Sequence, residues 1–356
     1  MTIVRNNLTT KAEDVAESSP KCDSTAHRDN GRSKANRQDL LRRFPAIPHK
    51  ADVQLMERTV RLEASTIAVL ELARGFFQHH QVGATGNPDF HWRIVCESDP
   101  RVESTATPLC AFSDPGLQYV NIGQRGFLAV DLERREAAAY LSDQFLKRDA
   151  RYRHRPPLDI LFSMTAPSLG LTSLSGGCVG LNDQGVLIFG PPNSGKTTAC
   201  YLAARCGMDF HADQVVFLDM KGNFLRAWGD PFPAVFRPKT AEFLPELQPT
   251  LRYSTYEDLE FYYFDKSPLQ PRLARPVSPV CGLFLNRNTT GENELTRTTE
   301  GEALSRLRDC LLFDEDNRFD AQITEALTAL AAIPIYNLRY GEDPKIAAGV
   351  IKELLS

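Results

Sequence analysis

The sequence lacks the features that mark membrane, secreted and cysteine-rich metal proteins. None of its apolar runs approaches the roughly 20 residues of a membrane-spanning helix, and residues 1–15 have no apolar core of the kind found in a signal peptide. Its 8 cysteines are scattered, with no CxxC pair and no histidine at ligand spacing. We therefore expect a cytoplasmic protein without membrane contact, whose cysteines are reduced and mostly buried.

The sequence also lacks an excess of either charge. Its 41 Lys and Arg residues nearly balance 45 Asp and Glu residues, which gives a formal net charge of -4. This balance offers no electrostatic reason for the chain to bind nucleic acid or an anionic membrane surface. Hydrophobic residues make up 42% of the 356 positions, which is enough for a sizeable core and for two domains.

Composition divides the chain into three parts. Residues 1–45 are rich in Ser, Asn, Asp, Lys and Arg without periodicity, and we expect a disordered tail. Residues 46–150 are expected to form a small, β-rich α+β domain, with an amphipathic helix over 54–77 followed by short antiparallel strands. Residues 151–356 are expected to form an α/β domain with a mixed sheet, so that the chain as a whole is α+β.

One stretch of the last domain carries a phosphate-binding motif, the P-loop or Walker A pattern. Residues 190–197 read Gly-Pro-Pro-Asn-Ser-Gly-Lys-Thr, which matches the pattern Gly, any four residues, Gly-Lys-Ser/Thr. An apolar run at 186–189 precedes it, and a helix-forming segment at 197–206, ended by Gly207, follows it. The motif therefore lies between a predicted strand and a predicted helix, as phosphate binding requires, because the amide groups at a helix N-terminus can then face an anion.

The residues of this loop have separate predicted roles. Lys196 is expected to reach the β- and γ-phosphates of ATP, and the Thr197 hydroxyl is expected to bind Mg²⁺. A tight turn between a strand and a helix would need no Gly-Lys-Thr at the helix start, so we favour the nucleotide site. The residues predicted to bind the nucleotide are Gly190, Pro191, Pro192, Asn193, Ser194, Gly195, Lys196, Thr197 and Thr198.

Two acidic residues are candidates to complete the metal site. Asp213 follows a short predicted strand at 209–212, and the carboxyl end of that strand would share a sheet edge with the loop. Asp219 follows an apolar run, but it lies 6 residues further on, roughly 20 Å away in an extended chain. We therefore favour Asp213 as metal ligand and catalytic base, and we expect Asp219 to open a turn at 220–223.

Two further side chains near the predicted site have open assignments. His211 is interpreted as a packing residue, although it would share a strand face with Asp213 if the strand is unbroken. Arg237 could contact a phosphoryl group through its guanidinium fork, or form a salt bridge with the acidic segment at 242–246.

Residues 185–219, GVLIFGPPNSGKTTACYLAARCGMDFHADQVVFLD, resemble the catalytic domain of HPr kinase/phosphorylase and, more closely, the HPr-kinase-like bacterial serine kinases. The likeness continues through DPFPAVFRPKT and PVCGLFLNRN to the C-terminus, and so covers about residues 155–356. It implies a nucleotide fold shared with phosphoenolpyruvate carboxykinase, ATP and Mg²⁺ as cofactors, and transfer of the γ-phosphoryl group to a protein or small-molecule hydroxyl. It also implies a partner protein, and homo-oligomerisation stays open.

Two positions depart from the pattern of that family. The family carries a histidine on the strand before the loop, whereas residues 174–177 here read Leu-Ser-Gly-Gly. The paired aspartates are reduced to Asp213-Gln214, although the family associates the first aspartate and the histidine with proton transfer and the second carboxylate with the metal. The sequence thus favours an ATP-binding serine kinase. It leaves two alternatives: a regulatory nucleotide-binding module with weak or no transfer, and a P-loop ATPase that uses Asp219.

Overall fold

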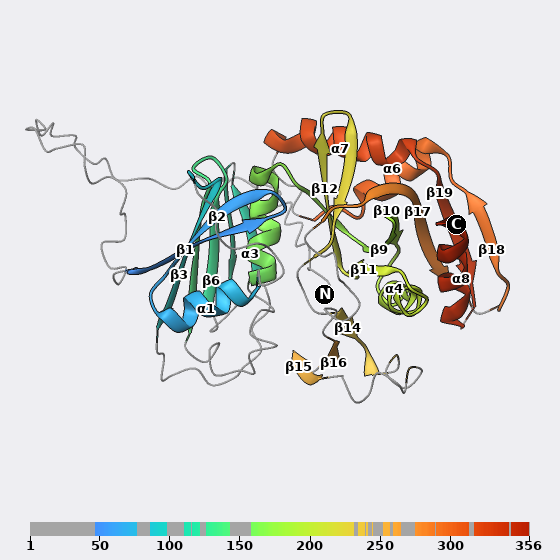
Figure 1. Ribbon diagram of the computed structural model, residues 1–356, viewed down its shortest axis with the longest axis horizontal. Helices are drawn as coiled ribbons and strands as arrows, with labels where there is room; N and C mark the ends of the chain where they lie inside the picture. Colours follow the sequence, from blue (N-terminus) through green and yellow to red (C-terminus); the bar gives the residue numbers. More distant parts are fainter. Residues whose placement is uncertain are drawn as a thin grey trace, which may run out of the picture. The chain divides into compact units, whose positions relative to one another are not determined.

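The protein is described by a computed structural model of mixed α/β architecture (Figure 1). The described residues are 47–76, 86–97, 110–114, 116–121, 126–142, 158–230, 234–238, 240, 244, 252–256, 259–264, 275–288, 290–312, 317–341 and 343–355. The tail predicted over residues 1–45 lies outside them. No helix among the described residues is long and apolar enough to cross a membrane.

A seven-stranded sheet formed by residues 49–142 has the order β1-β2-β3-β7-β6-β5-β4. Apolar side chains alternate along its strands and turn to one face, where they pack with helices α1 and α3 into a single core. Helix α1 contacts β1, β2 and β3, whereas α3 contacts β6 and β7. The elements are β1 His49–Leu55, β2 Arg58–Ala64, α1 Ile67–Phe76, β3 Phe90–Glu97, β4 Cys110–Asp114, β5 Leu117–Asn121, β6 Gly126–Asp131, β7 Glu136–Ser142 and α3 Leu158–Thr165.

The helix predicted over 54–77 is wrong in its first half, which forms the β1–β2 hairpin instead. Leu55, Val60 and Leu62 are spaced as on a helix, but they also alternate through two strands once the turn at Met56 and Glu57 is counted. The prediction of purely antiparallel strands is also wrong, because β3 pairs in parallel with both β2 and β7. When two paired strands are far apart in the chain, the local sequence does not indicate whether they run parallel or antiparallel.

A six-stranded sheet of order β11-β9-β10-β17-β19-β18 carries the glycine loop. Strands β10, β17 and β19 are parallel, and β9 is antiparallel to both β10 and β11, so the carboxyl ends of β10, β11, β17 and β19 meet at one edge. Its strands are β9 Gly177–Leu181, β10 Gln184–Phe189, β11 Asp209–Ala212, β17 Ser278–Arg287, β18 Glu294–Arg297 and β19 Ile335–Tyr340.

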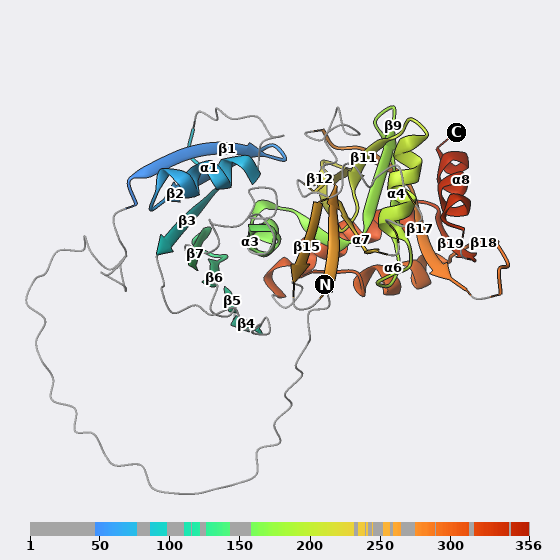
Figure 2. The same cartoon turned by 90° about the horizontal axis from the view of Figure 1, so that it is seen from below.

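Helices cover both faces of this sheet because β10 is apolar on both sides. Val186 and Ile188 belong to the core that includes α4 and α8, which lie side by side in Figures 1 and 2. Leu187 and Phe189 belong to the opposite core, with α6 and α7. These helices are α4 Lys196–Arg205, which lies within one residue of the helix predicted over 197–206, together with α6 Glu300–Arg308, α7 Asp320–Ala332 and α8 Pro344–Leu354.

Two smaller sheets and two short 3₁₀ helices complete the described structure. Strands β12 and β13 form one hairpin and β9 and β10 form another, the latter with Asn182 and Asp183 at positive φ in its two-residue turn. The remaining elements are the 3₁₀ helices Ala166–Leu169 and Asn317–Phe319 and the strands β8 Thr172–Ser175, β12 Val215–Lys221, β13 Phe224–Trp228, β14 Ala234–Phe236, β15 Arg252–Tyr256 and β16 Leu259–Phe264.

Candidate functional site

The glycine loop, residues 190–197, leaves the carboxyl end of β10 and enters α4. Gly190 and Gly195 have φ values of 144° and 94°, and a Cβ at Gly190 would lie 2.6 Å from the Leu285 carbonyl oxygen. A Cβ at Gly195 would collide with the Tyr340 hydroxyl. Both positions therefore require glycine, for backbone conformation and for space.

The N-terminus of α4 leaves its first amides to the loop. Gly195 is the N-cap residue and supplies no side-chain oxygen to them. In the loop itself, Pro191, Pro192 and Asn193 are exposed, whereas Ser194 and Thr198 are buried. An anion seated on this loop would meet backbone N–H groups and the positive end of the helix.

Lys196 folds back over the loop. Its ammonium donates hydrogen bonds to the carbonyl oxygens of Gly190, at 2.7 Å, and Pro191, at 3.0 Å. Burial lowers the pKa of Lys196, and the charges of its neighbours, Cys310 foremost and Asp213 among them, partly oppose that shift. The cation is thus held beside the loop, where a phosphate group would replace neutral carbonyl oxygens as its partner.

The structure brings Asp213 to the loop, as its predicted place after β11 requires. Its carboxylate oxygen Oδ2 accepts hydrogen bonds from the Thr197 hydroxyl, at 3.2 Å, and from the Val235 amide, at 3.3 Å. The hydroxyl and carboxylate are hard oxygen donors of the kind that Mg²⁺ prefers, and Mg²⁺ commonly takes one or two protein ligands together with phosphate oxygens. Among the described residues, no group of three or more His, Cys, Asp or Glu side chains could hold a metal.

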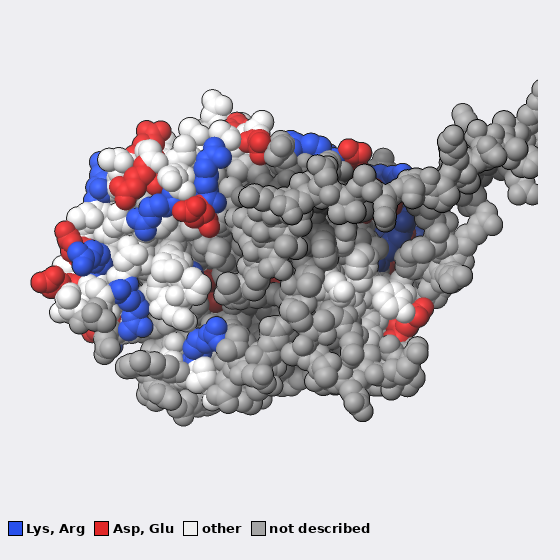
Figure 3. All heavy atoms as spheres, turned by 180° about the vertical axis from the view of Figure 1, so that it is seen from behind, with Lys and Arg blue, Asp and Glu red and all other residues white. Residues whose placement is uncertain are grey.

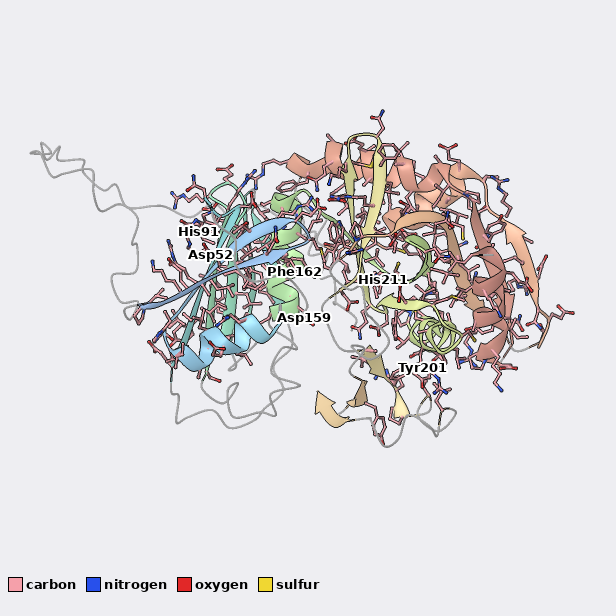
Figure 4. The ribbon with its side chains drawn as sticks, in the orientation of Figure 1. Asp52, His91, Asp159, Phe162, Tyr201 and His211 are labelled. Atoms are coloured by element: carbon pink, nitrogen blue, oxygen red, sulfur yellow. The ribbon has the colours of Figure 1, made fainter. Side chains whose placement is uncertain are left out.

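His211 packs away from this site. A β-bulge interrupts the pairing of β11 between Phe210 and Ala212, so the alternation that would align His211 with Asp213 is broken. The His211 ring lies among the strands (Figure 4), with Nε2 2.8 Å from where a Cβ of Gly180 would be. Gly180 pairs with Gly185, at the end of β10 opposite the loop. The packing interpretation of His211 therefore agrees with the structure.

Asp219 lies inside β12 and does not open the following turn, which corrects the prediction for it. Its buried carboxylate is bound by Arg226, at 2.6 and 2.9 Å, by Arg58, at 2.8 Å, and by the Trp228 indole N–H, at 3.1 Å. Burial acts to raise the pKa of Asp219, but these hydrogen bonds and charges outweigh it and lower the pKa. Both oxygens of this carboxylate are thus bound by protein groups, and we interpret the contacts with Arg58 and Arg226 as structural ion pairs. This argues against Asp219 as the metal ligand that the ATPase alternative needs.

The stretch that departs from the family pattern is closely packed. A Cβ at Gly177 would lie 2.6 Å from the Cys200 sulfur and 3.2 Å from the Ala212 carbonyl oxygen. At Gly176, a Cβ would lie 3.0 Å from the Phe189 ring. A side chain at either position would therefore require its neighbours to move.

Arg237 directly follows β14, the strand whose Val235 amide binds Asp213. This places its backbone near the candidate metal ligand. Of the acidic segment at 242–246, only Leu244 is described, so the alternative salt bridge of Arg237 lies outside the described residues.

Sequence reasoning missed Tyr340, which contacts the loop from β19, two places along the sheet from β10. Its buried hydroxyl donates a 2.6 Å hydrogen bond to the Ser194 carbonyl oxygen. Burial raises the pKa of Tyr340, and the charge of Arg287, at the end of β17, partly opposes that shift. A tyrosine at the end of a predicted strand carries no local sign of such a contact, because its partner lies 146 residues away.

We expect Tyr340→Phe to weaken ATP binding roughly 2- to 10-fold, the worth of one neutral hydrogen bond. The ring would still fill its place, while Ser194 would lose the contact that orients its carbonyl away from the anion. Titration calorimetry with Mg·ATP measures the change, and Tyr336→Phe on the same strand is the matched control. Equal affinities for wild type and Tyr340→Phe would show that the hydroxyl does not shape the loop.

Charged side chains of both signs are interspersed over the described part of the surface in Figure 3. On this face the described residues form no field of a single sign, which agrees with the near balance of charge in the sequence.

Comparisons with known proteins add little to this geometry. No family model matches the chain, and no curated protein matches its sequence. Among solved structures, the chain is similar to the Hpr(Ser) kinase/phosphatase from Coxiella burnetii, with 10% sequence identity, a TM-score of 0.27, and coverage of 51% of this chain and 94% of that one. A TM-score of this size carries no argument, so conclusions about function rest on the residues of this chain.

Proposed function

We propose that the protein binds Mg·ATP at the glycine loop and transfers the γ-phosphoryl group to a hydroxyl of a protein or small molecule, as a serine kinase does. The observation that carries the proposal is the 3.2 Å contact between Thr197 Oγ1 and Asp213 Oδ2, beside the Lys196 ammonium. A strand–loop–helix alone would favour phosphate binding. The added carboxylate supplies what phosphoryl transfer also needs: a second metal ligand and a proton acceptor.

In this proposal the groups of the loop hold the nucleotide and its metal, and Asp213 has a second task as proton acceptor. The amides at the start of α4 and the Lys196 ammonium hold the phosphates in place and balance their charge. Thr197 and Asp213 would hold Mg²⁺, which when bound neutralises charge on the phosphate oxygens. The Asp213 carboxylate takes the proton of the acceptor hydroxyl while the hydroxyl oxygen bonds to the γ-phosphorus. The bond from that phosphorus to the bridging oxygen of ADP breaks.

A regulatory nucleotide-binding module is the second candidate, favoured by the lack of a histidine at residues 174–177 and of a second aspartate next to Asp213. Without a histidine there, proton transfer has Asp213 alone, and general base catalysis is typically worth about 10²- to 10⁴-fold. A chain that binds ATP and transfers very slowly would signal through its nucleotide-bound state. Positioning and charge neutralisation carry most of phosphoryl transfer, so we favour the kinase.

Incubation with ATP labelled at the γ-phosphate separates the candidates. The acceptors to test are the proteins encoded beside this chain, together with water, whose phosphorylation appears as released inorganic phosphate. Label on a protein, lost in Asp213→Asn, supports the kinase. Binding of Mg·ATP with neither label transfer nor phosphate release supports the regulatory module. Phosphate release that persists in Asp213→Asn and disappears in a folded Asp219→Asn would contradict both.

A further inference from the structure

A further buried carboxylate, that of Asp230, binds the backbone that carries Asp213. Asp230 is 0% exposed and lies just beyond the end of β13. Its Oδ2 oxygen accepts hydrogen bonds from two backbone amides, those of Asp213 and Val215, each at 3.4 Å. Asp213 directly follows β11 and Val215 is the first residue of β12, so one carboxylate oxygen ties together the two ends of residues 213–215.

The chain is built so that Asp230 can reach this connection. The preceding residue, Gly229, lies against the backbone of His211, where a Cβ would stand 3.0 Å from the His211 Cα and would collide with its carbonyl group. Only glycine allows this approach. On the other side, the Gly176 amide donates a 3.0 Å hydrogen bond to the Gln214 carbonyl oxygen. Residues 213–215 are therefore held from two directions.

Asp230 and Val235 act on the same target from neighbouring positions in the chain. Asp230 holds the main chain of Asp213, while the Val235 amide holds its side-chain oxygen Oδ2 at 3.3 Å. That oxygen is the one that accepts the Thr197 hydroxyl hydrogen bond. Together these contacts fix the position of the Asp213 backbone and the orientation of its carboxylate.

We propose that Asp230 is a positioning residue that sets the Asp213 carboxylate against Thr197 through the amides of Asp213 and Val215. The proposal rests on the proposed function for the role of Asp213 itself. What Asp230 supplies is an acceptor oxygen at a fixed place, because buried amides need a partner and a carboxylate oxygen is a strong one. Its negative charge is not what the site uses.

The variants Asp230→Asn and Asp230→Ala separate position from charge. Asn keeps an acceptor oxygen at the same place, so we expect phosphate release from Mg·ATP to stay within about threefold of wild type. Ala removes the acceptor, and we expect a loss of about 10- to 100-fold, the usual cost of a missing residue that orients a ligand. Affinity for ADP in the presence of EDTA should be unchanged in both, since the loop is untouched. A wild-type rate in Asp230→Ala, or an equal loss in Asp230→Asn, would overturn the proposal.

Hydrogen exchange gives a readout that needs no activity. We expect the Asp213 and Val215 amides to exchange slowly in wild type and Asp230→Asn, and at least about tenfold faster in Asp230→Ala, because a lost acceptor frees them to water. If Asp230→Ala does not fold, Asp230→Glu replaces it. The added methylene displaces the acceptor oxygens, so the same losses are expected, and wild-type exchange and rate in Asp230→Glu would contradict a positioning role.

Failure of this proposal is distinguishable from failure of the proposed function. If wild type binds no Mg·ATP, the function is wrong, and the exchange of the two amides still decides whether Asp230 positions the connection. If wild type binds Mg·ATP but releases no phosphate, the Mg²⁺ dependence of its ATP affinity replaces the rate as the measure, with the same order expected among the variants.

Discussion

Replacing Asp213 with Asn is expected to slow phosphoryl transfer about 10²- to 10⁴-fold, the range that general base catalysis contributes. Asn is nearly the same size and keeps an oxygen that can accept the Thr197 and Val235 hydrogen bonds. It loses the negative charge and the capacity to take a proton. Single-turnover release of inorganic phosphate from Mg·ATP, with water as the acceptor, measures the effect without knowledge of the natural acceptor.

The same variant separates the two roles assigned to Asp213. ADP affinity in EDTA should match wild type, because the glycine loop and Lys196 are unchanged, whereas Mg²⁺ should strengthen ATP binding less than in wild type. Asp183→Asn is the matched control, since Asp183 is exposed at a turn with φ of 65°, a conformation in which Asn is equally well tolerated. Unchanged phosphate release in Asp213→Asn would remove Asp213 from the chemistry.

Replacing Asp219 with Asn is expected to cost about 3–5 kcal/mol of unfolding free energy and to leave the glycine loop able to bind nucleotide. The cost is large because the change removes the charge of a buried carboxylate that pairs with the partly buried guanidinium groups of Arg58 and Arg226, and removing one partner of a buried ion pair usually carries this penalty. Of its ion pairs with described residues, Arg226 keeps only the one with the exposed Glu57. The hydrogen bonds come from both halves of the described chain, and the shared core includes Phe217 of the same strand. Urea unfolding at pH 7 measures the loss.

The pH dependence of stability gives an independent check on Asp219. Its pKa is lowered in the folded protein from an ordinary value of 3.8, so the unfolded chain takes up the proton first as the pH falls. The stabilisation is therefore complete above about pH 5 and is lost as the pH falls below 3.8 through the folded pKa. As the pH falls from about 5 to below 3.8, Asp219→Asn should lose less stability than wild type.

Asp52→Asn is the control for this stability prediction. Asp52 forms a similar carboxylate–guanidinium pair with Arg61, but the two side chains are 20% and 33% exposed. Such pairs are typically worth about 0–1 kcal/mol. A loss in Asp219→Asn no larger than that of Asp52→Asn would contradict the structural role. Loss of phosphate release with stability intact would restore Asp219 as a candidate for the site.

Local signals account for what the sequence predicted well. The strand, loop and helix around residues 190–197 follow from an apolar run, a motif and a cap, all within one short stretch. The position of Asp213 followed from one further principle, that the carboxyl ends of parallel strands meet at the same edge of a sheet. The prediction of a helix where the β1–β2 hairpin lies failed for a local reason as well, because the spacing of Leu55, Val60 and Leu62 fits both a helix and a pair of strands. The turn at positive φ, which distinguishes the two, falls at Met56 and Glu57, where glycine or asparagine is more usual.

The parts of the site that escaped prediction depend on contacts between distant residues. Tyr340 meets Ser194 across 146 positions, and Asp230 meets the Asp213 amide across 17. Neither is marked by a motif, because each acts through backbone atoms that any residue could provide. The Asp219–Arg226 pair is different: its partners are 7 residues apart and face each other across the β12–β13 hairpin, so a known register would have revealed it.

Binding of Mg·ATP to wild type and Lys196→Ala, measured by titration calorimetry, tests the central claim most directly. Lysine to phosphate is a charge-assisted contact worth about 1.5–3 kcal/mol, so we predict about a 10- to 100-fold loss of affinity in Lys196→Ala. Lys221→Ala, which removes an exposed lysine at the end of β12, should leave the affinity unchanged. Equal affinities for wild type and Lys196→Ala, or no binding by wild type, would contradict a nucleotide site at this loop.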